Sequence, residues 1–322
     1  MIIISKKHEK ADVELRKVYC DTMLRLAEQD KRVIMLEADL MGSLGTKKIA
    51  EKYPDRVINC GIAESAMIGA ACGASIAGLI PFTHTFGPFA SRRVNDQVFM
   101  SGAFADANVK MLGSDAGITA EYNGGTHMPF DDAGIMRGIP NMTVIEFSDG
   151  AMVKNLLPKI KDMYGMVYMR MARKLSYELY EECSDFTIGK AAKLREGTDA
   201  AIFAMGYCVN EALKAAELLQ ADGISVSVYD MFTLKPVDAE TVLEEARKTG
   251  AVVTAENHSV VNGLGSAVAE VLCEGYPVPL ERVGIRDVVG EVGDVKYLAE
   301  AFKISARYIY DACKRAISRK SI

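Results

Sequence analysis

Several signatures of self-contained enzymes are missing from this chain of 322 residues. It has no Gly-x-Ser-x-Gly nucleophile elbow, no phosphate-binding P-loop and no His-Glu-x-x-His zinc motif, and it holds only four histidines. These absences argue against serine hydrolases, P-loop enzymes and zinc hydrolases. The segment Asn262-Gly263-Leu264-Gly265 lacks the third glycine and the acidic residue of a dinucleotide fingerprint, so nicotinamide binding is also disfavoured.

An excess of basic charge is absent as well. The chain has 38 Lys and Arg residues against 43 Asp and Glu residues, with both signs scattered along it. A protein that binds nucleic acid through its phosphates would show a basic stripe, so we expect no nucleic-acid partner. The seven cysteines form no Cys-x-x-Cys pair and mostly lie in apolar runs, which is typical of reduced thiols in a cytoplasmic protein.

Long apolar runs are also few. The first four residues are apolar, but charge follows at once, which is too short for a signal sequence or a spanning helix. The richest apolar stretch, 65–80, consists mostly of Ala, Gly and Ile and ends at a proline. We therefore expect no contact with a membrane and predict a buried core helix over this stretch.

The remaining pattern alternates short β-branched runs with amphipathic segments. It predicts helices over 210–220, 239–249 and 265–273, and strands over 33–36, 57–59, 80–83, 109–112, 143–146, 166–169, 200–205, 224–228, 252–255 and 282–285. Such alternation is typical of an α/β fold whose largely parallel sheets carry helices on both faces. A polar, acidic stretch over 174–199 is the best linker candidate, so we predict two domains, 1–185 and 186–322.

One carboxylate, Glu64, stands at the start of the small-residue helix. It is either an acidic first-turn residue that faces the helix dipole, or a desolvated carboxyl group whose pKa is raised toward useful proton transfer. The residues that follow the next strand place two rings, Phe86 and Phe89, three positions apart. Such a pair serves core packing or offers a stacking surface to a flat heterocycle.

The loop over 113–129 is long, polar and rich in glycine, and His127 lies near its end. Loops that follow strands commonly carry the ligand chemistry of α/β proteins. A histidine that follows a Gly-Gly-Thr turn is as suited to a functional role as to a structural one.

The order of these motifs resembles a known family. Gly61-Ile-Ala-Glu64, the two phenylalanines, Gly124-Gly-Thr-His127 and the segment 140–150 follow one another as in the pyrimidine-binding and C-terminal domains of transketolase. The resemblance covers nearly the whole chain. Arg93-Val-Asn-Asp96-Gln97 is more similar to the Arg-x-x-Asp-Gln pattern of deoxyxylulose-phosphate synthase and of 2-oxo-acid dehydrogenase β subunits.

The resemblance implies a cofactor, thiamine diphosphate, and roles for several residues. Glu64 would hydrogen-bond the pyrimidine ring and favour the tautomer that removes the thiazolium proton, and the cofactor would then carry the carbanion chemistry. Phe89 would stack on the pyrimidine and Phe86 would line its pocket. His127 would contact the oxygen atoms of the substrate, and Asp39 matches an acidic residue on the cofactor side.

The resemblance also implies a substrate site. Arg16, Ser43 and Arg173 match positions that transketolase uses for a sugar phosphate, and an arginine fork suits a tetrahedral anion. Three substrate positions depart from the family pattern and leave the sugar open: Asn123 replaces an aspartate, Asp115 a histidine and Arg92 a tyrosine.

The Gly-Asp-Gly segment with which the family holds Mg²⁺ and the diphosphate is missing from this chain. We therefore expect an N-terminal partner subunit that binds Mg²⁺, and a homodimeric core in a heterotetramer, with the helix over 65–80 at a two-fold interface. The expected activity is the transfer of a two-carbon ketol unit from an anionic ketose to an aldehyde. The alternatives are a 2-oxo-acid decarboxylating relative and a non-catalytic assembly subunit, although the presence of both Glu64 and His127 argues against the latter.

Overall fold

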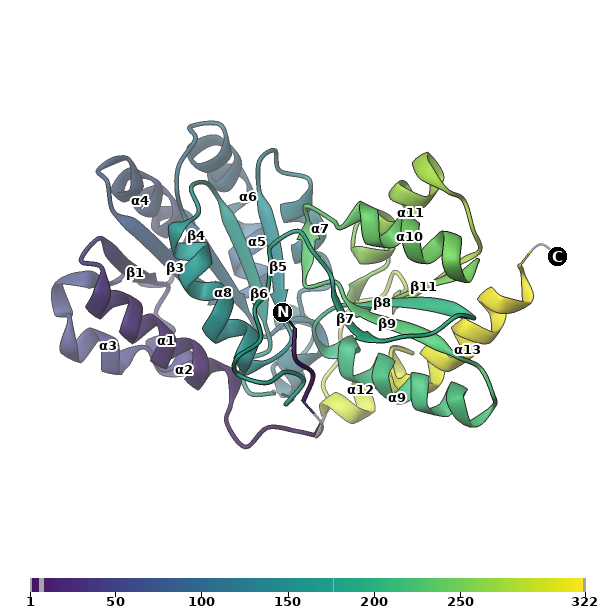
Figure 1. Cartoon of the computed structure of the whole chain (residues 1–322). Coiled ribbons are helices and arrows are strands. Elements are labelled where there is room, and N and C mark those ends of the chain that lie inside the picture. Colours follow the sequence, from purple (N-terminus) through teal and green to yellow (C-terminus); the bar gives the residue numbers. More distant parts are fainter. Residues whose placement is uncertain (1, 6–8, 176, 321–322) are drawn as a thin grey trace.

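Apolar and β-branched runs form the strands of two sheets, as their alternation with amphipathic segments predicts. The computed structural model describes residues 2–5, 9–175 and 177–320 (Figure 1). Within these residues both sheets are largely parallel and carry helices on both faces, so the predicted α/β fold is confirmed.

The first sheet has the strand order β10-β5-β6-β4-β3-β1-β2. Its neighbours pair in parallel, except that β10 runs antiparallel to β5. The strands are β1 (Val33–Glu37), β2 (Val57–Asn59), β3 (Ile80–Phe86), β4 (Lys110–Ser114), β5 (Thr143–Phe147), β6 (Val167–Met171) and β10 (Thr233–Lys235).

The second sheet has the order β12-β11-β8-β9-β7, in which the edge strand β7 alone is antiparallel to its neighbour. Its strands are β7 (Ala192–Arg195), β8 (Ala200–Ala204), β9 (Val226–Asp230), β11 (Val252–Ser259) and β12 (Leu280–Ile285). Successive side chains of a strand point to opposite faces, so Ile202 packs in one apolar cluster and Phe203 in the other.

Each sheet is covered on both faces, as Figure 1 shows for the second sheet most plainly. One face of the first sheet carries α1 (Leu15–Gln29), α2 (Met41–Leu44), α3 (Lys47–Lys52) and α8 (Gly150–Asp162), and the other carries α4 (Glu64–Ile76), α5 (Gly87–Ser91), α6 (Asn95–Gln97) and α7 (Asp132–Arg137). The second sheet lies between α9 (Tyr207–Ala221), α12 (Val295–Ala301) and α13 (Ala306–Ser318) on one side and α10 (Ala239–Thr249) and α11 (Leu264–Gly275) on the other.

The helix α4 corrects one prediction. It buries Met67, Ile68 and Ala71 against the sheet, but Gly69 and Gly73 on its other side are exposed. A fully buried core helix was the wrong interpretation because small apolar residues occur on every side of this helix, so its sequence does not show which face meets the sheet. No helix in the described part of the chain is long and apolar enough to cross a membrane.

The polar stretch over 174–199 is also more ordered than a linker. In its described part Leu179, Tyr180 and Phe186 are buried, and Tyr180 forms a bridge to Ile4 near the N-terminus. The same stretch contains β7. The domain boundary after residue 185 stays a prediction, and the chain crosses between the sheets again where β10, which follows β9, pairs with β5.

The carboxyl ends of the two sheets meet. Arg170, near the end of β6, donates from Nη2 to the main-chain oxygen of Asn257 on β11 at 2.7 Å. The loop that follows β4 lies at the end of β11, where the N–H of Ile118 donates to the Asn257 side chain. Most of the predicted site residues belong to the loops that follow β3, β4 and β6.

Candidate active site

Glu64 is the first residue of α4 and its side chain is 3% exposed. The chain reaches it through a tight turn after β2, in which Gly61 has a φ of 70° and donates its N–H to the Asn59 side chain. Arg93 Nη1 lies 2.8 Å and 2.9 Å from the two carboxylate oxygens, and Thr85 Oγ1 donates to one of them at 3.5 Å. The carboxylate is thus held at the first turn of a helix, where the helix dipole favours negative charge.

Three rings adjoin this carboxylate. Phe86 ends β3, Phe89 lies in α5 and His127 ends the Gly-rich loop, and the centroids of their rings lie 5.3–6.4 Å apart in edge-to-face contacts. Phe86 is buried, whereas Phe89 and His127 are partly exposed. The guanidinium carbon of Arg93 lies 4.1 Å from the Phe89 ring centroid. The Glu64–Phe89 pair therefore holds a flat hydrogen-bond donor against an aromatic face.

A second group of predicted residues includes Arg173, which lies near the Phe86 ring. Arg173 Cζ is 5.4 Å from the Phe86 ring centroid, and its Nε donates to Asp115 Oδ1 at 3.1 Å. Arg173 and Arg16 both donate to the main-chain oxygen of Ser43, at 3.3 Å and 2.7 Å. The structure thus brings together four of the predicted substrate residues and places two guanidinium groups beside one another.

Asp115 contributes to this group from a buried position. Its side chain is almost fully enclosed and its backbone has a left-handed φ of 62°. Burial raises the pKa of this carboxyl group, while the charge of Arg173 acts in the opposite direction. Asp115 is thus buried and paired with Arg173, and its predicted contact with the substrate stays a prediction.

Three further predicted residues lie outside these contacts. Asp39 has a left-handed φ of 61° and accepts a hydrogen bond from the Asn59 side chain at 2.9 Å. Arg92 points toward Asp131, 3.6 Å away, and lines a cavity of about 300 Å³ beside the Gly-rich loop. Asn123 is exposed on that loop. The roles of these three residues stay predictions.

A buried polar chain behind the rings was not predicted. Glu37 on β1 accepts from Thr46 Oγ1 at 2.6 Å and lies 2.8 Å from His84 Nδ1 on β3, and His84 Nε2 lies 3.0 Å from Ser114 Oγ on β4. It ties three neighbouring strands together directly before the residues that form the site. Its only signal in the sequence was a histidine inside an apolar strand, just as the signal of Arg93 was the Arg-x-x-Asp-Gln pattern.

Main-chain N–H groups of the Gly-x-Gly segment at the start of α11 are bound by a side chain of the same protein. The carboxylate of Glu256 accepts from the main-chain N–H groups of Leu264 and Gly265 at 2.7 Å and 2.8 Å. In a dinucleotide site these groups would face a pyrophosphate. The Glu256 carboxylate takes that place here.

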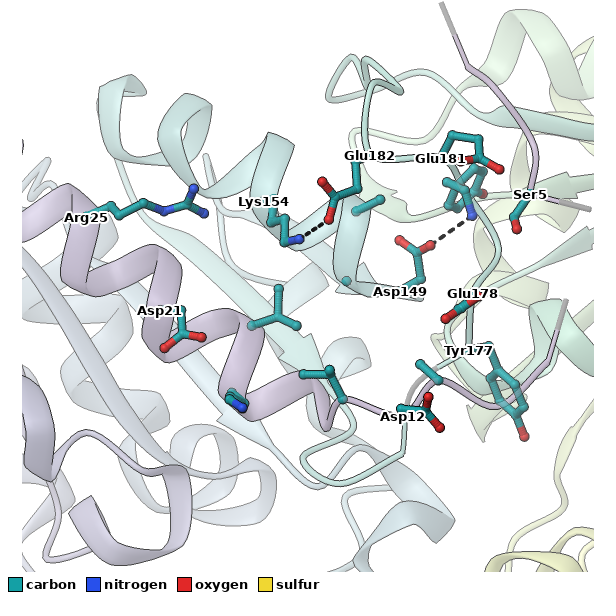
Figure 2. A pocket seen from close by; sticks show the side chains of 17 residues that line it. Ser5, Asp12, Asp21, Arg25, Asp149, Lys154, Tyr177, Glu178, Glu181 and Glu182 are labelled. Atoms are coloured by element: carbon teal, nitrogen blue, oxygen red, sulfur yellow. Dashed lines mark hydrogen bonds and ion pairs between the residues drawn. The ribbon is translucent and has the colours of Figure 1, made fainter. Parts of the chain in front are cut away.

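A cavity of about 590 Å³ lies elsewhere, between α1, the start of α8 and the segment 177–182 (Figure 2). Asp149 on its wall accepts from the main-chain N–H groups of Met152 and Tyr180, and Lys154 pairs with Glu182. Burial raises the pKa of Asp149 to about 6. Asp149 thus joins the segment 177–182 to α8, and none of the predicted site residues lines this cavity.

The described residues contain no cluster of three or more His, Cys, Asp or Glu side chains that could hold a metal ion. The site offers the carboxylates of Glu64 and Asp115, each paired with an arginine, together with aromatic faces and the neighbouring guanidinium groups of Arg16 and Arg173. It is therefore suited to a flat heterocycle and an anion rather than to a hard cation.

Comparison with known proteins gives the family. The model of the transketolase pyrimidine-binding domain matches residues 11–177, and that of the transketolase C-terminal domain matches residues 189–309. The chain belongs to the transketolase family. Transketolases use thiamine diphosphate, and the first of these models names the domain that binds its pyrimidine.

This transketolase chain matches several relatives along nearly their whole length. A 6-deoxy-6-sulfo-D-fructose transketolase subunit of Clostridium sp. (strain MSTE9) is 51% identical over 95% of both chains. A putative transketolase C-terminal section of Methanocaldococcus jannaschii is 39% identical, over 92% of this chain and 93% of that protein. The structure of a split-gene transketolase, an inactive β4 tetramer, superposes with a TM-score of 0.89 at 38% identity, over 97% of this chain and 100% of that one.

Proposed function

We propose that this chain is the C-terminal subunit of a two-chain transketolase, which moves a two-carbon ketol unit from an anionic ketose to an aldehyde. The observation that carries the proposal is the buried Glu64 carboxylate beside the Phe89 ring, with a flat guanidinium group bound to both. An aminopyrimidine offers the same features, a planar ring and hydrogen-bond donors at its edge. The residues therefore fit the pyrimidine half of thiamine diphosphate.

When bound, thiamine diphosphate supplies a nucleophilic carbon that attacks a ketose carbonyl and carries the two-carbon unit. Glu64 would hold a proton at the edge of the pyrimidine, in a setting where burial strengthens that hydrogen bond. Arg93 is 45% exposed, so its side chain can turn toward solvent and leave the carboxylate to the ring. His127, whose Nδ1 lies 2.9 Å from Thr126 Oγ1, would donate to a substrate oxygen from its other nitrogen.

The two arginines beside Ser43 support an anionic donor. Guanidinium groups bind tetrahedral anions such as phosphate and sulfonate with charge-assisted hydrogen bonds. The Clostridium relative is named for a sulfonated ketose, and a relative from Phocaeicola vulgatus, 35% identical, for apulose 4-phosphate. We therefore propose a ketose with a terminal phosphate or sulfonate group at Arg173, and place the sulfonate first because the sulfonate relative is the more similar of the two.

A partner subunit would hold Mg²⁺ and the diphosphate, because the Gly-Asp-Gly segment that the family uses for them is missing from this sequence. The exposed side of α4 supports an interface there. A side-chain carbon added at Gly69 or Gly73 would contact nothing within 4 Å, which leaves room for the close approach of another helix. We propose a homodimeric core and a heterotetramer, and expect Gly73→Arg to block assembly while the chain stays folded.

The test is a thiamine diphosphate titration by calorimetry, with and without an N-terminal transketolase subunit that carries the Gly-Asp-Gly segment. We expect Mg²⁺-dependent binding and ketol transfer only with both chains. Micromolar binding by this chain alone would overturn the two-subunit site. The Arg-x-x-Asp-Gln motif favours one second candidate, the decarboxylation of a 2-oxo acid, and the same reconstituted enzyme tested with pyruvate in place of the ketose separates the two.

A further inference from the structure

Asn257, on β11 of the second sheet, contacts the site loop from across the molecule. It is fully buried, its Nδ2 donates to the main-chain oxygen of Ala116 at 2.9 Å, and its Oδ1 accepts from the N–H of Ile118 at 2.9 Å. Between them lies Gly117, with a φ of 51°, where an added side-chain carbon would overlap the Asn257 amide. One amide side chain therefore determines the path of three residues in a loop that it does not belong to.

The residue directly before these three is Asp115, which holds Arg173. One oxygen of the Asp115 carboxylate accepts a hydrogen bond from Arg173 Nε. The other oxygen has no hydrogen-bond partner within the described residues. No second side chain therefore fixes the carboxylate. The position of the Asp115 carboxylate therefore depends on the backbone on either side of it. On one side, the N–H of Ala116 donates to the main-chain oxygen of Met171 on β6 at 3.3 Å.

Asn257 is itself held from the first sheet. Its main-chain oxygen accepts from Arg170 Nη2, and the Arg170 side chain is completely buried between Asp132 and Glu146. Arg170 lies three residues before Arg173 in the chain. A closed circuit of contacts thus runs from Arg173 through Asp115 and the loop to Asn257, and back through Arg170.

We propose that Asn257 is a positioning residue that aligns Arg173 for the anionic end of the substrate. The second domain, which supplies no group to the reaction in our assignment, would in this way set the substrate preference of the first. This inference rests on the proposed function for its kinetic consequence, but the contact between Asn257 and the loop does not depend on it.

The first measurement is amide hydrogen exchange on the full chain. In Asn257→Ala we expect the amides of residues 116–120 to exchange about tenfold faster, because the loop loses two hydrogen bonds. Thr254→Val is the matched control: Thr254 is buried on the same strand, and its hydroxyl has no hydrogen-bond partner within the described residues. Unchanged exchange in Asn257→Ala, or an equal change in Thr254→Val, overturns the proposal.

The second measurement uses the reconstituted two-chain enzyme with a ketose phosphate or sulfonate and with the same ketose lacking that group. We expect Asn257→Ala to raise KM for the anionic donor about tenfold while kcat changes less than about threefold and the neutral donor is unaffected. In an Arg173→Ala background the same substitution should change KM less than about twofold. Equal losses with both donors, or losses that persist without Arg173, overturn the proposal.

Gly117→Ala keeps the proposal testable should Asn257→Ala fail to fold. The added carbon presses on the Asn257 amide from the loop side, so it should reproduce the selective rise in KM. A failure of the proposed function looks different: wild-type enzyme would then treat the anionic and the neutral donor alike, whereas the exchange result on the loop would stand.

Discussion

The carboxyl ends of the two sheets make different use of buried polar side chains. At the first sheet Arg93 and His127 reach solvent, and the buried carboxylate of Glu64 is paired with an arginine that is 45% exposed. At the second sheet the carboxylate of Glu256 is bound to the start of α11, and His258 accepts an N–H from Gly134 in the first domain at 3.1 Å. Both ends follow the same topological rule, by which loops after parallel strands collect polar groups.

The difference shows what separates a site from an interface. The polar groups of the second sheet bind one another and the neighbouring loop, so they stabilise the contact between the domains. Those of the first sheet include an arginine that can turn toward solvent. The following predictions test this division, beginning with the largest expected effect.

Glu64→Gln should abolish ketol transfer and leave stability unchanged. The amide can still accept from Arg93 but cannot exchange a proton as a carboxyl group does, and such groups contribute about 10²- to 10⁴-fold to rate. Turnover of the reconstituted enzyme, with partner and cofactor saturating, is the measurement, and thermal unfolding checks the fold. Activity within about threefold of wild type would remove Glu64 from the reaction.

Arg170→Met should lower the free energy of unfolding, in contrast to Glu64→Gln, which should leave it unchanged. Arg170 binds Asp132 and Glu146 with all three side chains buried, so its removal leaves two carboxylates without their cation. Breaking such a pair costs about 3–5 kcal/mol in the free energy of unfolding. Denaturant unfolding measures this loss. The control is Lys154→Met, which breaks the exposed pair with Glu182 and should lower the free energy of unfolding by less than about 1 kcal/mol. Equal losses of stability in the two variants would contradict the view that the buried polar groups around Arg170 stabilise the contact between the domains.

His258 should make the domain contact sensitive to acid. Burial lowers the pKa of His258 from 6.5 to about 4, and Arg170 acts in the same direction, against the opposing charge of Asp132. The unfolded state therefore binds one more proton between these pH values, so stability falls as pH drops from about 6.5 toward 4, by roughly 2–4 kcal/mol from this group. Unfolding of wild type and His258→Gln between pH 4 and 7 is the measurement. Parallel curves would show that His258 does not contribute.

Arg173→Ala should have the smallest of these effects and the most selective. It removes a charge-assisted contact worth about 1.5–3 kcal/mol, so KM for the anionic donor should rise while kcat changes little. Steady-state kinetics with donors that carry or lack the terminal group give the answer. Equal use of both donors by the wild-type enzyme would place the anion elsewhere.

Much of the fold could be predicted from local pattern. The apolar runs of β1 and β5 lie within one residue of the predicted strands, because a buried parallel strand needs a short continuous apolar run. The edge strands β7 and β10 were missed. They are short and carry Lys193, Arg195 and Lys235, and they become strands only by pairing with segments far along the chain.

The candidate site divides in the same way. Motif order pointed to Glu64, Phe86, Phe89 and His127, and the structure brings these four together. Asn257 could not be found, because it lies 141 residues from the loop oxygen to which it donates and carries no motif of its own.

The sequence by itself determined the alternation of strands and helices, the family motifs and their order along the chain. These are properties of neighbouring residues, and burial of apolar runs against a sheet is enough to produce them. Only the tertiary structure decided which face of α4 is exposed, that Asp115 holds Arg173, and that a strand of the second sheet binds the loop of the first. Those contacts join residues far apart in sequence, and a buried hydrogen bond forms only where the fold brings its donor and its acceptor together.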